Sequence, residues 1–489
     1  MMTIKTSRVF SIIFVVLTIL LLSACSKKPT PPPPSLPQWT ILGYFDGNND
    51  QDKKIVSGKT FSYVIKDVQE MEKVGSTQDV QIVVMLGSFK TKGNCNYYFI
   101  EKCLGDCDST DSISSKVLDS LGIKDMSNPQ NLRDFIKYGV EHYPAQHYVL
   151  IINDHGDGWR GVCSDSINGD QSLMTLPELS FALSGYKFDI IVFDAPSMSM
   201  VEVAYQLKDK ANYLVLSQYR DFRRNILCFG MWLQDLTISP NMSVRSLARE
   251  ITQTTYTTAV DQGIAVNISA IGLSQVDALI SKIADFGSLL GVTLTGDYWK
   301  EVVDARKILS HLPIYFFDLK NFCQNIQTSD SLDSAIKNAA QAVENANDVV
   351  VVKTLSSDSG YGGLSIHFPY ISGDFDSARY VELDFAVSNW HIFLSRFIQA
   401  YAEVHTGSLQ ILTYPVEGAR IFLDGQDTGL ETNTTIHGIP EGDHTIKVVK
   451  TGYKEEVRSS VYIIAGSTKV LIIHLYPLSP LRESISELQ

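Results

Sequence analysis

The sequence predicts an α/β fold with a mostly parallel sheet covered by helices on both faces, followed by a small all-β domain. Nearly continuous apolar runs alternate with amphipathic segments between about Gln38 and Val404, a pattern typical of buried parallel strands linked by helices. From Gly407 the pattern changes to short alternating strands divided by Pro, Gly and Asp turns, as in a sandwich or barrel. With 489 residues, 44% of them hydrophobic, the chain can form two or three domains with a large core.

The elements of the α/β part follow from these periods. The expected buried strands are the apolar runs 40–45, 80–86, 147–153, 188–193 and 213–217. Amphipathic helices are expected at 131–143 and 176–185, and after Asn241 at 243–262, 274–291 and 331–347. Two later strand-like pieces, 348–355 and 362–370, could extend the same sheet.

The N-terminus has the parts of a bacterial lipoprotein signal peptide, assigned to residues 1–24. Lys5 and Arg8 precede an almost wholly apolar stretch, which ends in Leu22-Ser23-Ala24-Cys25. Small residues before a cysteine resemble the lipobox, in which the cysteine is acylated after cleavage. Lipidation of Cys25 would tether the mature chain to a membrane of the cell envelope. The alternative is a plain signal peptide with a chance cysteine.

Residues 25–37 then form a linker whose consecutive prolines favour a stiff, extended spacer. We expect the α/β domain at 38–404, the β domain at 407–477 and a tail at 478–489. The formal charge of −13 argues against nucleic acid as a partner.

Three cysteines, Cys95, Cys103 and Cys107, crowd one stretch of the chain. In an exported protein one disulfide is plausible there, with its connectivity open. A zinc site is the weaker interpretation, because no C-x-x-C pair and no nearby histidine accompany them.

Two expected strands end in polar loops that could carry chemistry. The strand 147–153 runs into DHGDGW (154–159), and the strand 188–193 runs into DAPS (194–197). Because sites form where the carboxyl ends of parallel strands meet, His155 and the 194–197 corner are expected to lie close together. The glycines on both sides of Asp157 would let a substrate backbone approach. A histidine facing the next strand end is the geometry of a base and its nucleophile.

Four stretches resemble the clostripain family of cysteine peptidases. They are DHGDGWRG (154–161), PELSFAL (177–183), FDAPSMSMVEVAYQL (193–207) and GLSIHFP (363–369). The resemblance spans roughly 38–404 and implies a caspase-like fold and cleavage after basic residues.

The family's pattern at the second loop is Asp-Ala-Cys-Leu-Met-Gly-Met-Val-Glu. Carried onto this sequence, the resemblance implies that His155 is the catalytic histidine and that Asp194 lies in the pocket for a basic side chain. Gly156, next to His155, is one of the glycines expected to admit a substrate backbone. The nucleophilic cysteine falls on Pro196. Proline has no thiol or hydroxyl and no backbone N–H, so both the nucleophile and a possible oxyanion donor are lost.

Three other residues could replace the nucleophile. Ser197 is adjacent to the lost position, but neighbouring side chains of an extended chain point to opposite sides. Cys163 and Cys228 could approach from other loops, although nothing in their context indicates an activated thiol. Asp194 could instead cap the following helix, and His155 could be a relic.

Two further segments carry weaker signals. The loop FDGNNDQD (45–52) places Asp46, Asn48, Asp50 and Asp52 at alternate positions, which weakly suggests calcium, but it lacks the glycine and the final acid of an EF-hand. No other metal or cofactor is expected. The second segment contains TYPVEGARIFLDGQDTG (413–429) and IPEGDHTIKVVKTGY (439–453). On these stretches, residues 407–477 resemble the PEGA domain, a small β module of bacterial surface proteins, which implies an accessory role.

The sequence therefore favours a lipid-anchored, inactive clostripain homologue that binds a peptide or protein in its former substrate cleft. One alternative is an active endopeptidase that cleaves after Arg or Lys with Ser197 or a displaced cysteine. The other is a surface scaffold or adhesin that acts through the β domain.

Overall fold

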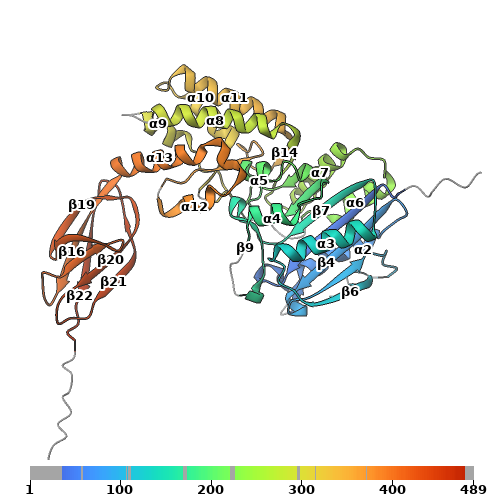
Figure 1. Ribbon diagram of the computed structural model, residues 1–489, viewed down its shortest axis with the longest axis horizontal. Coiled ribbons are helices and arrows are strands. Elements are labelled where there is room, and N and C mark those ends of the chain that lie inside the picture. The colour runs from blue at the N-terminus through green and yellow to red at the C-terminus, as the bar shows by residue number, and fades with distance from the viewer. Residues whose placement is uncertain are drawn as a thin grey trace, which may run out of the picture.

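The computed structural model describes residues 36–478 except 57–58, 106, 108–111, 169–172, 221–225, 294–297, 314 and 371 (Figure 1). The expected signal peptide, Cys25 and most of the linker lie outside the described residues, as does the tail after Leu478. Within the described ranges, the helices are too short or too polar to cross a membrane.

A nine-stranded sheet forms the centre of the α/β part, in the order β14-β12-β11-β10-β7-β1-β4-β5-β6. The five central strands are parallel: β4 (Val80–Ser88), β1 (Trp39–Gly47), β7 (His147–Asn153), β10 (Phe188–Asp194) and β11 (Ala211–Leu216). Antiparallel strands extend both edges: β5 (Asn94–Phe99), β6 (Lys116–Ile123), β12 (Asn267–Gly272) and β14 (Val351–Ser356). The predicted mostly parallel sheet is confirmed, because each expected buried strand is one of the parallel five.

Helices cover both faces of this sheet, as predicted. One face packs against α3 (Pro129–His142), α4 (Leu176–Ala182) and α5 (Val201–Gln206). The other face packs against α2 (Tyr63–Val74), α6 (Phe229–Ile238) and α7 (Val244–Asp261). Successive side chains of β10 point to opposite faces of the sheet. Ile191 and Phe193 lie in the first core, and Ile190 and Val192 lie in the second. Full burial of each such side chain contributes roughly 1.5–3 kcal/mol.

A helical group follows, made of α8 (Val276–Thr293), α9 (Tyr298–Ala305), α10 (Leu319–Thr328), α11 (Ser334–Val350), α12 (Ser377–Tyr380) and α13 (Trp390–Val404). The expectation for 348–355 is partly wrong, because Asp348 to Val350 complete α11 before β14 begins. The segment 362–370 does not extend the large sheet. Its strand β15 (Ser365–His367) pairs with β13 (Phe316–Asp318) in a separate small sheet.

Two short hairpins lie near the ends of the central strands. They pair β2 (Lys53–Val56) with β3 (Lys59–Ser62) and β8 (Val162–Ser164) with β9 (Leu173–Met174).

The C-terminal part is the small all-β domain that the sequence predicts, at the end of α13 in Figure 1. One sheet has the order β19-β16-β22 and the other the order β18-β17-β20-β21. The strands are β16 (Thr406–Tyr414), β17 (Arg420–Leu423), β18 (Gln426–Glu431), β19 (Thr434–Pro440), β20 (Gly442–Val449), β21 (Glu456–Ile463) and β22 (Thr468–His474). Apolar side chains of both sheets form its own core.

Cys103 and Cys107 are joined in a disulfide, which settles the connectivity that the sequence left open. Cys95 is buried with a free thiol. Burial raises the pKa of that thiol to about 12, so it is protonated at neutral pH.

Candidate functional site

The two loops singled out by the sequence lie at the same edge of the sheet. β7 and β10 pair in parallel, with Asp194 opposite Asn153. Just past this pair, the Asp154 N–H donates to the Asp194 carbonyl over 3.2 Å. The loop after β7 and the corner after β10 therefore begin side by side.

His155 extends from the loop after β7 and has a partner at each ring nitrogen. Its Nε2 lies 2.9 Å from Asp50 Oδ1, and its Nδ1 contacts the side-chain amide of Gln51. The His155 side chain is 28% exposed, whereas that of Asp50 is 86% exposed. The imidazole is thus held by the loop after β1 and faces a carboxylate at the solvent boundary.

A layer of buried carboxyl groups positions this histidine and the loop after β1. Asn49 donates to Asp154 over 2.6 Å, and Asn48 donates to Asp165 over 2.7 Å. Burial, followed by the charges of Asp154 and Asp165, raises the pKa of the nearby Asp46 carboxyl well above its usual range. These hydrogen bonds hold the loop after β1, which includes Asp50 and Gln51.

The corner after β10 is packed inside the protein. Pro196 is buried, and a Cβ added to Gly156 would lie 2.3 Å from the Pro196 carbonyl oxygen. Ser197 is 3% exposed and adopts a left-handed backbone with φ of 60°. Its N–H donates to the Tyr219 carbonyl over 2.9 Å. The described partners of the His155 ring are Asp50 and Gln51, and Ser197 is not one of them.

The glycines of the histidine loop accommodate the chain itself. The Cβ side of Gly156 faces Pro196 and Met198, and the Cβ side of Gly158 faces Met200 and Phe316. These glycines therefore let neighbouring protein segments approach closely, rather than leaving that space for a substrate backbone.

Asp194 is 2% exposed, and its carboxylate accepts a hydrogen bond from the Asn153 side chain. The alternative role as a helix cap is wrong, because α5 begins at Val201 with Met200 at its N-cap position and no side-chain cap. The structure thus places Asp194 beneath the loops.

The two other cysteines considered as nucleophiles are buried. Burial raises the pKa of the Cys228 thiol to about 11, so it carries little thiolate at neutral pH. The backbone N–H of Cys163 donates to the His155 carbonyl over 3.0 Å. Cys163 is therefore held to the histidine loop through its backbone.

A pocket of about 670 Å³ opens beside His155. It is lined by Asn49, Asp50, His155, Gly156, Asp157, Arg160, Ser164, Ser166, Leu173 and Arg379. Of the residues predicted for the site, His155 and Gly156 reach this pocket, whereas Asp194, Pro196 and Ser197 do not line it.

A buried wall stands behind the two arginines of this pocket. Trp159 precedes Arg160 in the chain and Tyr380 follows Arg379, and these two rings pack edge to face with centroids 5.0 Å apart. The carboxyl of Glu202 accepts from the Tyr380 hydroxyl over 2.7 Å and from the His367 N–H over 2.9 Å. Burial raises the pKa of Glu202 to about 7, while burial and then the charge of Arg160 lower that of His367 to about 3.

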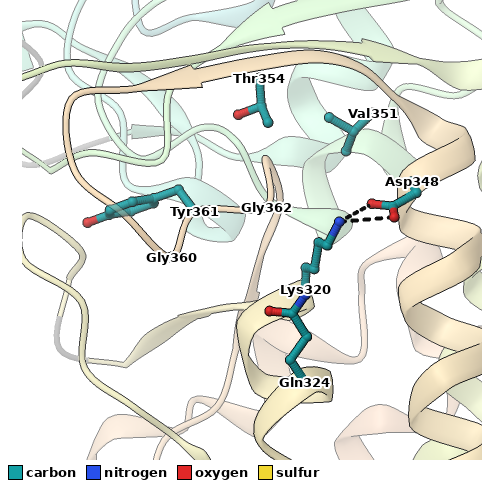
Figure 2. Close-up of a pocket in the computed structure, with 8 residues that line it drawn as sticks. All are labelled: Lys320, Gln324, Asp348, Val351, Thr354, Gly360, Tyr361 and Gly362. Carbon is teal, nitrogen blue, oxygen red and sulfur yellow. Dashed lines mark hydrogen bonds and ion pairs between the residues drawn. The ribbon is translucent and has the colours of Figure 1, made fainter.

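A second pocket, of about 340 Å³, lies between α10, α11, β14 and the glycine-rich segment 360–362 (Figure 2). Lys320 points toward Asp348, and its ammonium lies 2.7 and 2.9 Å from the two carboxylate oxygens. The charges of this pocket are therefore paired with each other, and we assign it no chemistry.

The side chains of the calcium-like loop point to different partners. Asp50 meets His155, and Asn48 meets Asp165. The Asp52 carboxylate accepts from the hydroxyls of Ser62 and Ser88, each over 2.8 Å. No group of three or more His, Cys, Asp or Glu side chains is arranged to hold a metal ion in the part of the chain that the structure describes.

Sequence reasoning missed three residues of this site. Gln51 was passed over, and Asp50 was weighed only for calcium, although both contact His155. Arg379 carried no local signal, since it comes from α12, far along the chain from the other residues of the pocket.

Comparison with known proteins identifies the family. A model of the clostripain family matches residues 56–405, and a model of the PEGA domain matches residues 406–478. Clostripain of Hathewaya histolytica is 34% identical over 97 residues, which cover 17% of this chain and only 18% of that protein.

Two solved structures share the fold. A secreted C11 cysteine protease from Bacteroides thetaiotaomicron, in complex with an irreversible peptide inhibitor, has a TM-score of 0.54 at 22% identity and covers 72% of this chain and 99% of its own. An inactive zymogen C11 protease from Parabacteroides distasonis has a TM-score of 0.55 at 20% identity and covers 73% and 99%. The family model matches well over half of this chain, and the paired strands β7 and β10 at its centre lead into the loops that hold His155 and Pro196. This chain therefore belongs to the clostripain family.

Proposed function

We propose that this chain is a peptide-binding clostripain homologue that does not cleave its ligand. The observation that carries the proposal is Pro196, which stands where the family resemblance implies the nucleophilic cysteine. A pyrrolidine ring cannot form a covalent bond with a peptide carbonyl.

The surroundings of this position support the loss of catalysis. Pro196 is buried against Gly156, and both ring nitrogens of His155 are engaged by residues of another loop. Ser197 is almost fully buried, and the Cys228 thiol is held in its protonated form. None of these alternatives meets the need of catalysis for an accessible nucleophile beside a free base.

The pocket beside His155 supports binding. Its volume of about 670 Å³ falls within the range of small-ligand sites and can take side chains of an extended peptide. A family member without a nucleophile would keep such a pocket to hold a peptide or protein segment without turnover.

The test is a cleavage and binding assay on the purified protein. We expect the wild-type protein to hydrolyse fluorogenic peptides with Arg or Lys before the scissile bond no faster than the His155→Ala variant does. Hydrolysis that disappears in His155→Ala would overturn the proposal. Labelling of Ser197, Cys163 or Cys228 by a covalent probe, dependent on His155, would then identify the substitute nucleophile.

We further propose that a lipid on Cys25 anchors the chain to a membrane of the bacterial cell envelope. The motivating observation is the basic, apolar and small-residue order that ends at Cys25. Metabolic labelling with a fatty-acid analogue should mark the protein and should fail in a Cys25→Ala variant. Equal labelling of both would contradict the anchor.

A further inference from the structure

The pocket beside His155 contains two guanidinium groups from distant parts of the chain. Arg160 lies in the short helical turn after the histidine loop, and Arg379 lies in α12. The Arg379 Nη2 is 3.4 Å from the Arg160 carbonyl oxygen, which sets the two residues side by side. Tertiary folding therefore makes one wall of this pocket rich in arginine.

The carboxylates that line the pocket already have partners. Both oxygens of Asp157 lie 3.2 Å from Arg160 Nη1, and Asp50 contacts the His155 ring. The Arg160 guanidinium also lies over the Trp159 ring, 5.1 Å from its centroid, which holds it in place.

Arg379 differs, because no carboxylate pairs with its guanidinium in the part of the chain that the structure describes. The nearby Asp376 accepts from the Arg379 backbone N–H over 3.1 Å, which leaves the side-chain charge available. An arginine fork without a carboxylate partner is suited to bind a planar anion in two parallel hydrogen bonds.

The acid that the family resemblance assigns to a basic side chain does not balance this charge. Asp194 is 2% exposed and accepts from Asn153, and it does not line the pocket. A lysine or arginine side chain entering beside His155 would therefore meet Arg160 and Arg379, while the carboxylates of the lining, Asp50 and Asp157, already contact His155 and Arg160.

We infer that this pocket selects a peptide carboxylate, supplied by an Asp or Glu side chain or by a C-terminus, with Arg379 as the principal contact. This inference rests on the proposed peptide binding and names the chemistry of the ligand. It predicts a preference opposite in charge to the basic residues that the family resemblance implies.

The test measures fluorescence anisotropy of short labelled peptides of alanine and serine with the purified protein. Three peptides with amidated C-termini differ only in two central residues, which are Glu, Gln or Lys, and a fourth carries Gln and a free C-terminus. We expect the Glu peptide to bind about tenfold more tightly than the Gln peptide, and the Lys peptide to bind more weakly than both. Tight binding of the fourth peptide would identify the C-terminal carboxylate as the ligand group.

The Arg379→Gln variant should weaken binding of the Glu peptide about tenfold, because it removes the fork but keeps a polar side chain. Arg396→Gln is the matched control, since Arg396 is an exposed arginine of α13 that does not line this pocket. It should change the affinity less than about twofold.

Equal affinity for the Glu, Gln and free-carboxylate peptides, or equal effects of the two variants, would overturn the inference and leave peptide binding intact. Tighter binding of the Lys peptide would also overturn the inference. No binding of any peptide would overturn the proposed peptide binding and this inference with it. Hydrolysis of a bound peptide would instead overturn the proposed loss of catalysis, whatever the charge preference.

Discussion

The loop after β7 and the corner after β10 begin as hydrogen-bonded neighbours but differ in what they offer to a ligand. The first carries His155 and Asp157 to a pocket, where the exposed Asp50 joins them. The second places Pro196 and Ser197 in the packed interior. Adjacent strand ends can therefore have opposite fates, since one loop lines a polar pocket and the other belongs to the core.

The largest expected effect comes from forcing the two regions apart. Gly156→Ala would place a methyl group 2.3 Å from the Pro196 carbonyl oxygen, which is backbone and cannot move aside cheaply. We expect a loss of about 3 kcal/mol in the free energy of unfolding, measured by urea titration. Gly373→Ala is the control, since no atom lies within 4 Å of its added Cβ. Equal stability of the two variants would show that the loops are not in tight contact.

A pH experiment tests the buried carboxyl of Glu202, which lies beyond the corner in α5. Burial raises the pKa of Glu202 from 4.5 to about 7, so the folded state binds a proton that the unfolded state has released. The stability contributed by this proton is complete below pH 4.5 and is lost as the pH rises toward 7. Relative to Glu202→Gln, the wild-type protein should lose about 2.5 kcal/mol of its free energy of unfolding between pH 5 and pH 8.

Comparing this variant with the wild type is necessary, because Asp318 titrates over an overlapping range. Burial raises its pKa to about 6 in the folded protein. A pH dependence that is the same in both proteins would contradict the assignment to Glu202.

A cysteine at the corner tests whether the proposed lack of catalysis depends on Pro196 alone. The thiol of Pro196→Cys would be buried, so we expect no cleavage of peptides with Arg or Lys. Its reaction with a thiol reagent should be about 100-fold slower than in the unfolded protein. Ser395→Cys, on the exposed side of α13, is the control for an accessible thiol. Rapid labelling or cleavage by Pro196→Cys would mean that the corner still opens to the pocket.

The smallest effect is expected at the exposed partner of the histidine. Asp50→Ala should change the free energy of unfolding by less than about 0.5 kcal/mol, since an exposed ion pair contributes little. Asp52→Ala, in the same loop, removes a buried carboxylate that accepts from Ser62 and Ser88 and should cost several times more. Thermal or urea unfolding of both variants measures the two losses. A larger loss for Asp50→Ala than for Asp52→Ala would contradict this ranking and show that Asp50 is also structural.

The sequence alone was enough to predict the sheet. Apolar runs predicted all five parallel strands, because a strand buried on both faces needs hydrophobic side chains at nearly every position. The proposed loss of catalysis also rests on the sequence, since the family resemblance places Pro196 at the nucleophile position and proline has no group that can attack. Segment 362–370 was misplaced because a short apolar run does not specify which strand it will pair with.

Only the tertiary structure decided the partners of the site. Hydrophobic periodicity encodes which residues are buried, but it does not encode which distant polar side chains meet at the surface. Asp50 therefore contacts His155 although its local sequence indicated only a weak calcium site, and Arg379 contacts Arg160 without any signal in its local sequence. The burial of Asp194 likewise depends on how neighbouring loops pack over a strand end, which no single segment of the chain determines.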